Sequence, residues 1–183
     1  DESARGPEGA MSTARAGVTL DVAGADEAPI LANLLELYAH ELSDVFGLEI
    51  GADGRFGYPR LPLYWSEPGR FPFLIRSDGR LAGFALATVG SPASDEPDAM
   101  DVAEFFVLRR HRKTGVGGRA AVRLWNGFPG RTWTVRVSTA NARAVSFWNG
   151  AVGAYARDGV RESTLAGNPH PWRVLTFRSR RPL

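Results

Sequence analysis

The sequence predicts a mixed α/β (α+β) fold, and three patterns support this prediction. Apolar residues recur every three or four positions from Leu31 to Phe46, as along one face of an amphipathic helix. Two apolar runs flank Asp78-Gly79, a dipeptide that favours a tight turn between antiparallel strands. Residues 132–139 alternate in the manner of a strand. We expect residues 1–17, which are small and polar, to form a flexible leader, and residues 18–183 to form a single domain.

The first part of the domain is expected to hold one strand and one long helix. The stretch 18–23 favours a short strand. Asp26 is the expected N-cap of the helix, and Pro29 suits its first turn. Gly47 follows the last periodic residue and is expected to end the helix.

An irregular region follows from Gly47 to Pro72. It is rich in glycine, proline and aromatic residues and contains a few acids. A loop of this length inside a compact domain is usually either functional or disordered, and its aromatic content argues against disorder. We therefore expect it to contribute to a binding site.

The remaining elements alternate between strands and helices. Strands are predicted over 71–77, 80–89, 100–108 and 132–139, with an acidic loop at 91–99, and a helix is predicted over 119–125. Asn141 is the expected N-cap of a second helix, over 142–152, which Gly153 is expected to close. The last strands are expected around 154–159 and 171–179.

Composition excludes several kinds of chemistry. The chain has no cysteine, which rules out disulfides, thiolate metal sites and a cysteine nucleophile. No apolar run reaches the ~18 residues of a membrane span, and no secretory signal is present, so the cytoplasm is the simplest expectation. His40-Glu41 begins like H-E-x-x-H, but Asp44 stands where the second histidine is needed, and we expect no metal. No G-x-S-x-G motif supports a serine hydrolase.

Charge is distributed unevenly along the chain. The net charge is only +2, yet residues 105–157 contain ten Lys and Arg and no Asp or Glu. A segment of one sign creates a local positive potential that would attract a polyanion. A solvated arginine face is the alternative, and a nucleic-acid-binding module is a second possible use of the same segment.

Three glycines after the predicted strand 100–108 suggest a phosphate-binding loop. A Walker loop is excluded because Lys113-Thr114 precedes Gly115, Gly117 and Gly118 instead of following them. The segment 115–120 fits the dinucleotide pattern G-x-G-x-x-A, but no acid stands about 20 positions further on. The remaining pattern is R-x-x-G-x-G at Arg112 to Gly117. A tight turn that needs glycine only for its geometry is the alternative.

This R-x-x-G-x-G segment resembles the acyl-CoA pyrophosphate loop of the GNAT N-acetyltransferase superfamily. The resemblance extends to residues 103–108, to the later Asn141, Ala144, Phe147 and Trp148, and to the order of the predicted elements. It covers nearly the whole chain after residue 17 and is weakest before Phe71. It implies a GNAT fold, with a mostly antiparallel sheet of six to seven strands that splays between its fourth and fifth strands and is flanked by helices.

The resemblance also implies which residues bind acetyl-CoA as cosubstrate. The backbone of Val107 and Arg109 would pair with the pantetheine arm. Amides at the start of the following helix would hold the pyrophosphate, because a helix N-terminus carries roughly half a positive charge. The implied cofactor-binding residues are Val107, Arg109, Arg112, Lys113, Thr114, Gly115, Val116, Gly117, Gly118, Asn141, Phe147 and Trp148.

Glu104 is the candidate general base, and a structural carboxylate paired with an arginine is the equal alternative. Strand alternation turns its neighbour Phe105 to the opposite face. Many family members have a tyrosine where this chain has Trp148, and an indole cannot protonate a thiolate. Tyr155, another tyrosine or water would then serve, or the thiolate would leave unassisted.

The implied function is transfer of an acetyl group from acetyl-CoA to the amine of a small molecule, by direct attack in a ternary complex. The acceptor would lie against the irregular region, with Tyr58, Tyr64 and Glu67 as substrate-binding residues. A non-catalytic acyl-CoA-binding protein of this fold is the alternative that Trp148 leaves open. We expect no nucleic acid and no membrane as partners, and a homodimer is possible because exposed final strands often pair between subunits.

Overall fold

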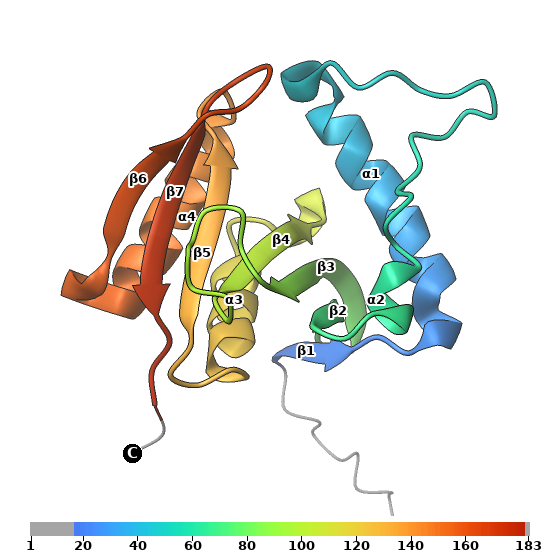
Figure 1. Cartoon of the computed structure of the whole chain (residues 1–183). Helices are drawn as coiled ribbons and strands as arrows, with labels where there is room; N and C mark the ends of the chain where they lie inside the picture. Colours follow the sequence, from blue (N-terminus) through green and yellow to red (C-terminus); the bar gives the residue numbers. More distant parts are fainter. Residues whose placement is uncertain (1–16, 182–183) are drawn as a thin grey trace, which may run out of the picture.

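A computed structural model describes residues 17–181, which form one seven-stranded sheet with helices on both faces (Figure 1). The strands are β1 (Val18–Val22), β2 (Arg70–Ser77), β3 (Arg80–Val89), β4 (Met100–Val107), β5 (Thr132–Ser138), β6 (Arg161–Leu165) and β7 (Trp172–Arg178). The helices are α1 (Ala28–Phe46), α2 (Leu63–Ser66), α3 (Val116–Asn126) and α4 (Ala142–Ala156). Short 3-10 turns lie at Ala25–Glu27, Arg109–His111 and Arg157–Gly159. Apart from Gly17, the predicted leader lies outside the described residues.

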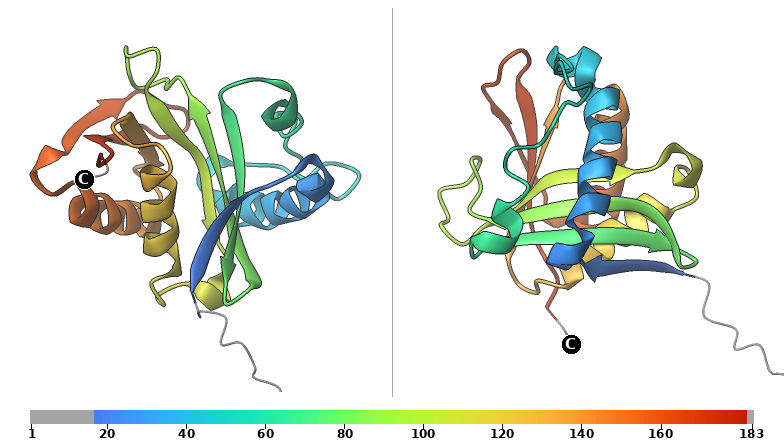
Figure 2. Two further views of the ribbon diagram at one scale, coloured as in Figure 1. Left: turned by 90° about the horizontal axis from the view of Figure 1, so that it is seen from below. Right: turned by 90° about the vertical axis from the view of Figure 1, so that its right-hand side faces the viewer.

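The sheet has the order β1-β2-β3-β4-β5-β7-β6, and β4–β5 is its parallel pair among antiparallel neighbours. Helix α1 covers one face, and α3 and α4 cover the other (Figure 2). The prediction of a mostly antiparallel sheet of six to seven strands is therefore confirmed. Strand β6 forms one edge with largely exposed side chains, and pairing of that edge between subunits stays a prediction.

Helix α1 follows the prediction closely except at its first turn. Gly47 ends it in the left-handed region at φ 62°, which glycine adopts without steric cost. The predicted cap was wrong: Asp26 lies in a 3-10 turn, and Glu27 is the N-cap residue of α1. The Glu27 carboxylate instead accepts a hydrogen bond from the backbone N–H of Gly24 at 3.2 Å, and this bond stabilises the turn that leads into α1.

Helices α3 and α4 are both longer than predicted. Helix α3 begins at Val116, directly after Gly115, instead of at Arg119. Helix α4 continues to Ala156, so the strand expected at 154–159 was wrong, and the strand after α4 is β6. Gly153 does not stop α4 because Trp148, Val152 and Tyr155 extend one buried stripe past it at helical spacing.

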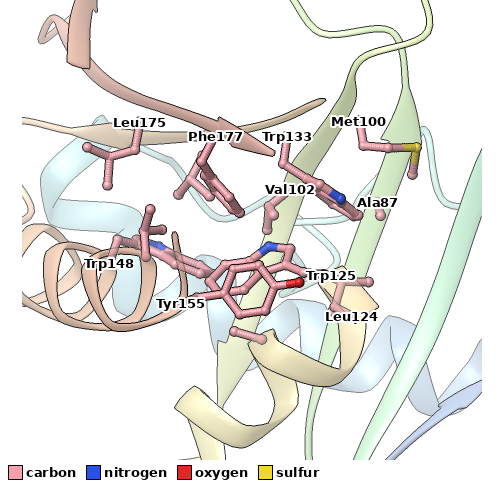
Figure 3. Close-up of a cluster of buried hydrophobic side chains, with 14 of the residues drawn as sticks. Ala87, Met100, Val102, Leu124, Trp125, Trp133, Trp148, Tyr155, Leu175 and Phe177 are labelled. Atoms are coloured by element: carbon pink, nitrogen blue, oxygen red, sulfur yellow. The ribbon is translucent and has the colours of Figure 1, made fainter. Parts of the chain in front are cut away.

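An aromatic cluster fixes α3 and α4 against the sheet (Figure 3). Trp125 contacts Tyr155 and Phe177 with ring centroids 4.8 and 4.9 Å apart. The indole N–H groups of Trp125 and Trp133 are buried and have no hydrogen-bond partner among the described residues. Leaving such a donor unpaired costs about 1–3 kcal/mol, which packing of the large rings offsets. The cluster gives α4 a rigid base next to β4 and β5.

Within residues 17–181, no helix combines the length and the apolar character needed to cross a bilayer.

Candidate active site

Strands β4 and β5 separate after a short paired stretch, and a cavity opens where they part. Pairing covers three residue pairs, from Met100 with Trp133 to Val102 with Val135, although β4 continues to Val107. The cavity has a volume of about 700 Å³. Its lining comes from α1, the 48–60 loop, β4, β5, the start of α4 and the loop between β6 and β7. It therefore connects the α1 face of the sheet with the α4 face.

A β-bulge at Ala103 sets which side chains of β4 face this cavity. In the pairing with β3, Leu86 lies opposite Glu104 and Ala87 lies opposite Val102, which leaves Ala103 as the extra residue. Strict alternation would place residues three apart on opposite faces of the sheet, so the bulge lets Asp101 and Glu104 share the α1 face.

Phe105 lies on the other face, as the alternation after Glu104 predicts. It contacts Phe147 and Trp148 of α4 with ring centroids 5.9 and 5.0 Å apart.

Two tyrosines hold the Glu104 carboxylate. The Tyr38 hydroxyl donates to Oε2 at 2.8 Å, and the Tyr58 hydroxyl donates to Oε1 at 3.1 Å. Burial raises the pKa of Glu104, and the two hydrogen bonds and the Arg136 charge oppose that shift only in part. Burial and the neighbouring carboxylate also raise the pKa of both tyrosines, so they stay protonated and act as donors. The result is a carboxylate whose proton affinity is higher than that of an exposed glutamate.

A buried ion pair lies beside this carboxylate. The guanidinium of Arg136 donates to Asp101 through Nε at 3.1 Å and Nη2 at 2.6 Å, and Asp101 is 1% exposed. The Thr134 hydroxyl donates to Asp101 Oδ1 at 2.6 Å. This bidentate pairing fixes Arg136 at the cavity wall.

The glycine loop after β4 has the geometry of an anion site. Gly115 has φ 81°, and Lys113, although not a glycine, has φ 60°, so the chain turns sharply into α3. A Cβ on Gly117 would lie 3.0 Å from the Phe147 ring, whereas a Cβ on Gly118 would meet no atom within 4 Å. A Cβ at 117 would therefore crowd the Phe147 ring, which would have to shift by a few tenths of an ångström, whereas no protein atom in the structure restricts position 118.

Two arginines that precede the glycines, Arg109 and Arg112, bind other parts of the protein. Arg112 donates through Nε to the Val107 carbonyl at 2.7 Å and through Nη2 to Glu41 of α1 at 2.8 Å. Arg109 also donates to Glu41, at 3.1 Å. The Arg112 side chain is thus a link between α1 and the end of β4, and only its backbone belongs to the loop surface.

The remaining loop residues predicted to bind the cofactor take different positions. The Lys113 side chain is exposed, and the Thr114 hydroxyl donates to the His111 carbonyl at 2.6 Å. The Val116 side chain is buried in the core. These residues can therefore hold an anion mainly through the backbone N–H groups at the start of α3.

The backbone of Val107 faces the side from which β5 has diverged. The Leu108 N–H donates to the Ala82 carbonyl at 2.8 Å. In an antiparallel ladder this makes Val107 and Gly83 a non-hydrogen-bonded pair, so the polar groups of Val107 point away from β3. The Val107 carbonyl on that side already accepts Arg112 Nε, and the pairing of Val107 with a pantetheine arm stays a prediction.

Of the four predicted residues on or beside α4, Asn141 and Trp148 line the cavity, whereas Phe147 and Tyr155 do not. Asn141 caps α4 by accepting the Ala144 N–H at 3.1 Å and also lines the cavity with Trp148. Tyr155 is 3% exposed, donates to Asn126 Oδ1 at 2.8 Å and accepts the Arg180 N–H at 3.0 Å. It does not line the cavity, so the structure does not support the predicted acid role of Tyr155.

The three predicted substrate-binding residues lie in different places, and only one of them lines the cavity. Tyr58 lines the cavity. Tyr64 is 4% exposed and packs behind it, and burial raises the pKa of Tyr64 to about 12. Glu67 is exposed and pairs with Arg70 at 2.7 Å, outside the cavity lining. Of the three, only Tyr58 is placed to touch an acceptor.

Sequence reasoning missed several residues that build the site. Tyr38 falls within the apolar stripe of α1, and no local pattern links it to Glu104. Arg136 does carry a signal, because it is the one charged residue in the strand at 132–138. Phe46 and Trp172 stack with ring centroids 5.5 Å apart at the far end of the cavity, and nothing in the sequence links them. Among residues 17–181, no three His, Asp or Glu side chains gather as a metal ion would need.

The chain matches the model of the acetyltransferase (GNAT) family over residues 33–153. With the splayed sheet and the glycine loop, this match shows that the chain belongs to the GNAT acetyltransferase family. No curated protein matches the sequence.

Solved structures share the fold at low sequence identity. The aminoglycoside acetyltransferase AAC(6')-Ib, solved with coenzyme A, is 17% identical with a TM-score of 0.64, over 88% of this chain and 95% of the other. Spermidine N-acetyltransferase from Vibrio cholerae, solved with CoA and spermine, is 13% identical with a TM-score of 0.61, over 88% and 95%. The ribosomal-protein-S18-alanine N-acetyltransferase from Escherichia coli is 15% identical with a TM-score of 0.59, over 91% and 96%.

Proposed function

We propose that this protein transfers an acetyl group from acetyl-CoA to the primary amine of a small molecule, by direct attack in a ternary complex. The observation that supports this most is Glu104, a carboxylate of raised pKa at the wall of a cavity that passes through the splayed sheet. A general base works best when its pKa lies near the working pH, and burial moves Glu104 in that direction.

The acetyl-CoA would be held mainly by backbone groups. Its pyrophosphate would lie at the N-terminus of α3, where the first-turn N–H groups and the open space beside Gly118 allow close approach. Its pantetheine arm would run along the free side of β4 at Val107. This arrangement brings the thioester into the cavity beside Glu104.

The reaction needs few chemically active groups. The amine nitrogen attacks the thioester carbonyl carbon, a C–N bond forms and the C–S bond breaks. Glu104 accepts the proton that the amine loses, directly or through water, and the coenzyme A thiolate leaves and takes a proton from solvent. A thiol pKa near 8.5 makes the thiolate a tolerable leaving group, and orientation alone can supply ~7–11 kcal/mol.

The ion pairs of the basic segment weaken the nucleic-acid alternative. Arg109 and Arg112 pair with Glu41, and Arg136 pairs with Asp101. These acids lie outside residues 105–157, so the fold neutralises part of the charge that the sequence concentrates there.

Thermal unfolding with excess acetyl-CoA, with NADH and ATP as controls, tests cosubstrate binding. A ligand at one hundred times its Kd adds ~2.7 kcal/mol, which gives a visible rise in Tm. Thiol release on addition of amines then tests transfer. A rise in Tm without thiol release for any primary amine would favour the non-catalytic alternative, and no rise at all would overturn the proposal.

A further inference from the structure

We infer that the acceptor is a monoamine whose single ammonium group is carried on an aromatic or other apolar body, and not a polycation. This inference rests on the proposed function and concerns only the acceptor end of the cavity.

The charges of the cavity lining argue for one ammonium group. The charged side chains among the lining residues are Glu49, Arg60, Glu104 and Arg136, whose formal charges sum to zero. Arg136 is already compensated by Asp101, but Arg60 would repel a second positive group on the ligand. Each further ammonium group of a polyamine or an aminoglycoside would lose hydration in the cavity and would need its own carboxylate, and this wall offers only Glu104 beside the proposed reacting position and Glu49 on an exposed loop.

The end of the cavity formed by α1 and the β6–β7 loop has an aromatic wall. Phe46, at the C-terminus of α1, stacks on Trp172, at the start of β7, with an interplanar angle of 23°. Phe46 belongs to a helix that packs on the sheet, whereas Trp172 belongs to β7, beyond the point where β4 and β5 part. The β6–β7 loop approaches the end of α1 at the top of Figure 1. Together they form an aromatic surface in the cavity lining.

Trp172 is held in place before any ligand arrives. A Cβ on Gly167 would lie 2.5 Å from the Trp172 indole, so the loop can pass this close only because residue 167 is glycine. The Arg136 guanidinium lies 5.8 Å from the centre of the same ring. An aromatic group fixed on several sides loses little conformational entropy when a ligand packs against it.

A second part of the cavity lining is also aromatic, and hydrogen bonds hold it in place. Glu36 of α1 accepts the backbone N–H of Phe56 at 2.7 Å and of Gly57 at 2.9 Å. These bonds hold the loop that carries Phe56 and Tyr58 into the cavity lining. An apolar body between Phe56 and the Phe46–Trp172 pair would then be enclosed while its amine reaches Glu104.

The test compares acceptors at saturating acetyl-CoA, with thiol release as the readout. We expect kcat/KM for 2-phenylethylamine to exceed that for spermidine and kanamycin by at least tenfold. Equal or better use of spermidine or kanamycin would overturn this inference and leave the proposed function intact. If acetyl-CoA raises Tm but none of the amines releases thiol, the proposed function fails instead.

A variant of Phe46 tests whether the aromatic surface is the cause of the preference for an aromatic amine. Phe46→Leu should lower kcat/KM for 2-phenylethylamine by about tenfold, through lost apolar contact, and leave that for methylamine within about twofold. Leu37→Ala, which alters an exposed residue of the same helix that does not line the cavity, should change neither value. An equal loss for both amines in Phe46→Leu would show that Phe46 supports the fold and not acceptor choice, and would overturn the aromatic wall as the determinant.

Discussion

The Tyr38 hydroxyl donates to Glu104 Oε2 at 2.8 Å and thereby joins α1 to β4 across 66 positions of the chain. A second tyrosine, Tyr58, donates to the other oxygen of the same carboxylate. Glu104 is therefore positioned by two segments that line the cavity, α1 and the 48–60 loop. Its protonation depends on two hydrogen bonds that can be removed one at a time.

Glu104→Gln is expected to lower kcat by about 10²- to 10⁴-fold, because the amide cannot accept the amine proton. Acetyl-CoA should still raise Tm as in the parent protein, since Glu104 does not belong to the glycine loop. The matched control is Glu67→Gln, which alters an exposed carboxylate outside the cavity and should keep full activity. Unchanged kcat and pH dependence in Glu104→Gln would remove Glu104 as the base.

Tyr38→Phe should shift the acidic limb of the rate profile to higher pH. As the proposed base, Glu104 would act only when ionised, so activity should rise as pH increases through its pKa, which burial already places above that of an exposed glutamate. The Tyr38 hydrogen bond lowers that pKa, and its loss lets the pKa rise further. Tyr58→Phe should act in the same direction. In Tyr155→Phe, which changes a hydroxyl in the core, the limb should stay in place, and a limb that moves equally in all three variants would contradict this assignment.

Gly118→Ala distinguishes an effect on cosubstrate binding from an effect on the stability of the fold. A Cβ at 118 meets no protein atom, and alanine favours a helix over glycine by up to ~1 kcal/mol, so Tm should be unchanged or higher. If the pyrophosphate lies against this turn, the methyl group should raise the Kd of acetyl-CoA by about tenfold.

Gly115→Ala is the contrasting variant, and its main effect should be on stability. At φ 81° a side chain costs ~1–2 kcal/mol, which thermal unfolding without ligand would detect. Calorimetry measures the Kd of acetyl-CoA for Gly118→Ala. If this Kd equals that of the parent protein, the turn before α3 does not belong to the binding site.

Arg136→Met should destabilise the protein by ~3 kcal/mol, because it leaves the Asp101 carboxylate buried without its partner. Urea unfolding gives the difference. Arg143→Met, an exposed arginine of α4, is the control and should change stability by less than ~0.5 kcal/mol. Asp101→Asn combined with Arg136→Met should recover part of the loss, and a double variant as unstable as Arg136→Met alone would argue against an ion-pair effect.

Local signals explain what could be predicted from the sequence. The glycine loop, the Asn141 cap and the end of α1 at Gly47 each depend on a few neighbouring residues, and the structure contains all three. The predicted end of α4 at Gly153 was wrong, because a glycine on the exposed side of a helix ends it only when the buried stripe of the helix ends there too.

The missed features depend on contacts between distant segments. No local pattern shows that Tyr38 reaches Glu104, that Phe46 meets Trp172, or that Ala103 is a bulge. The bulge matters most, because a regular strand would separate Asp101 and Glu104 onto opposite faces. Tyr155 follows Trp148 closely in the sequence, but α4 extends to Ala156 and holds the Tyr155 side chain in the core.

The pairing of Glu41 with Arg109 and Arg112 has a consequence for binding in solution. Mobile counterions screen exposed side-chain charges at physiological ionic strength, where the Debye length is about 8 Å. Backbone N–H groups at a helix start approach an anion directly, inside that distance. We therefore expect the affinity for acetyl-CoA to depend less on added salt than the ten Lys and Arg of residues 105–157 would suggest.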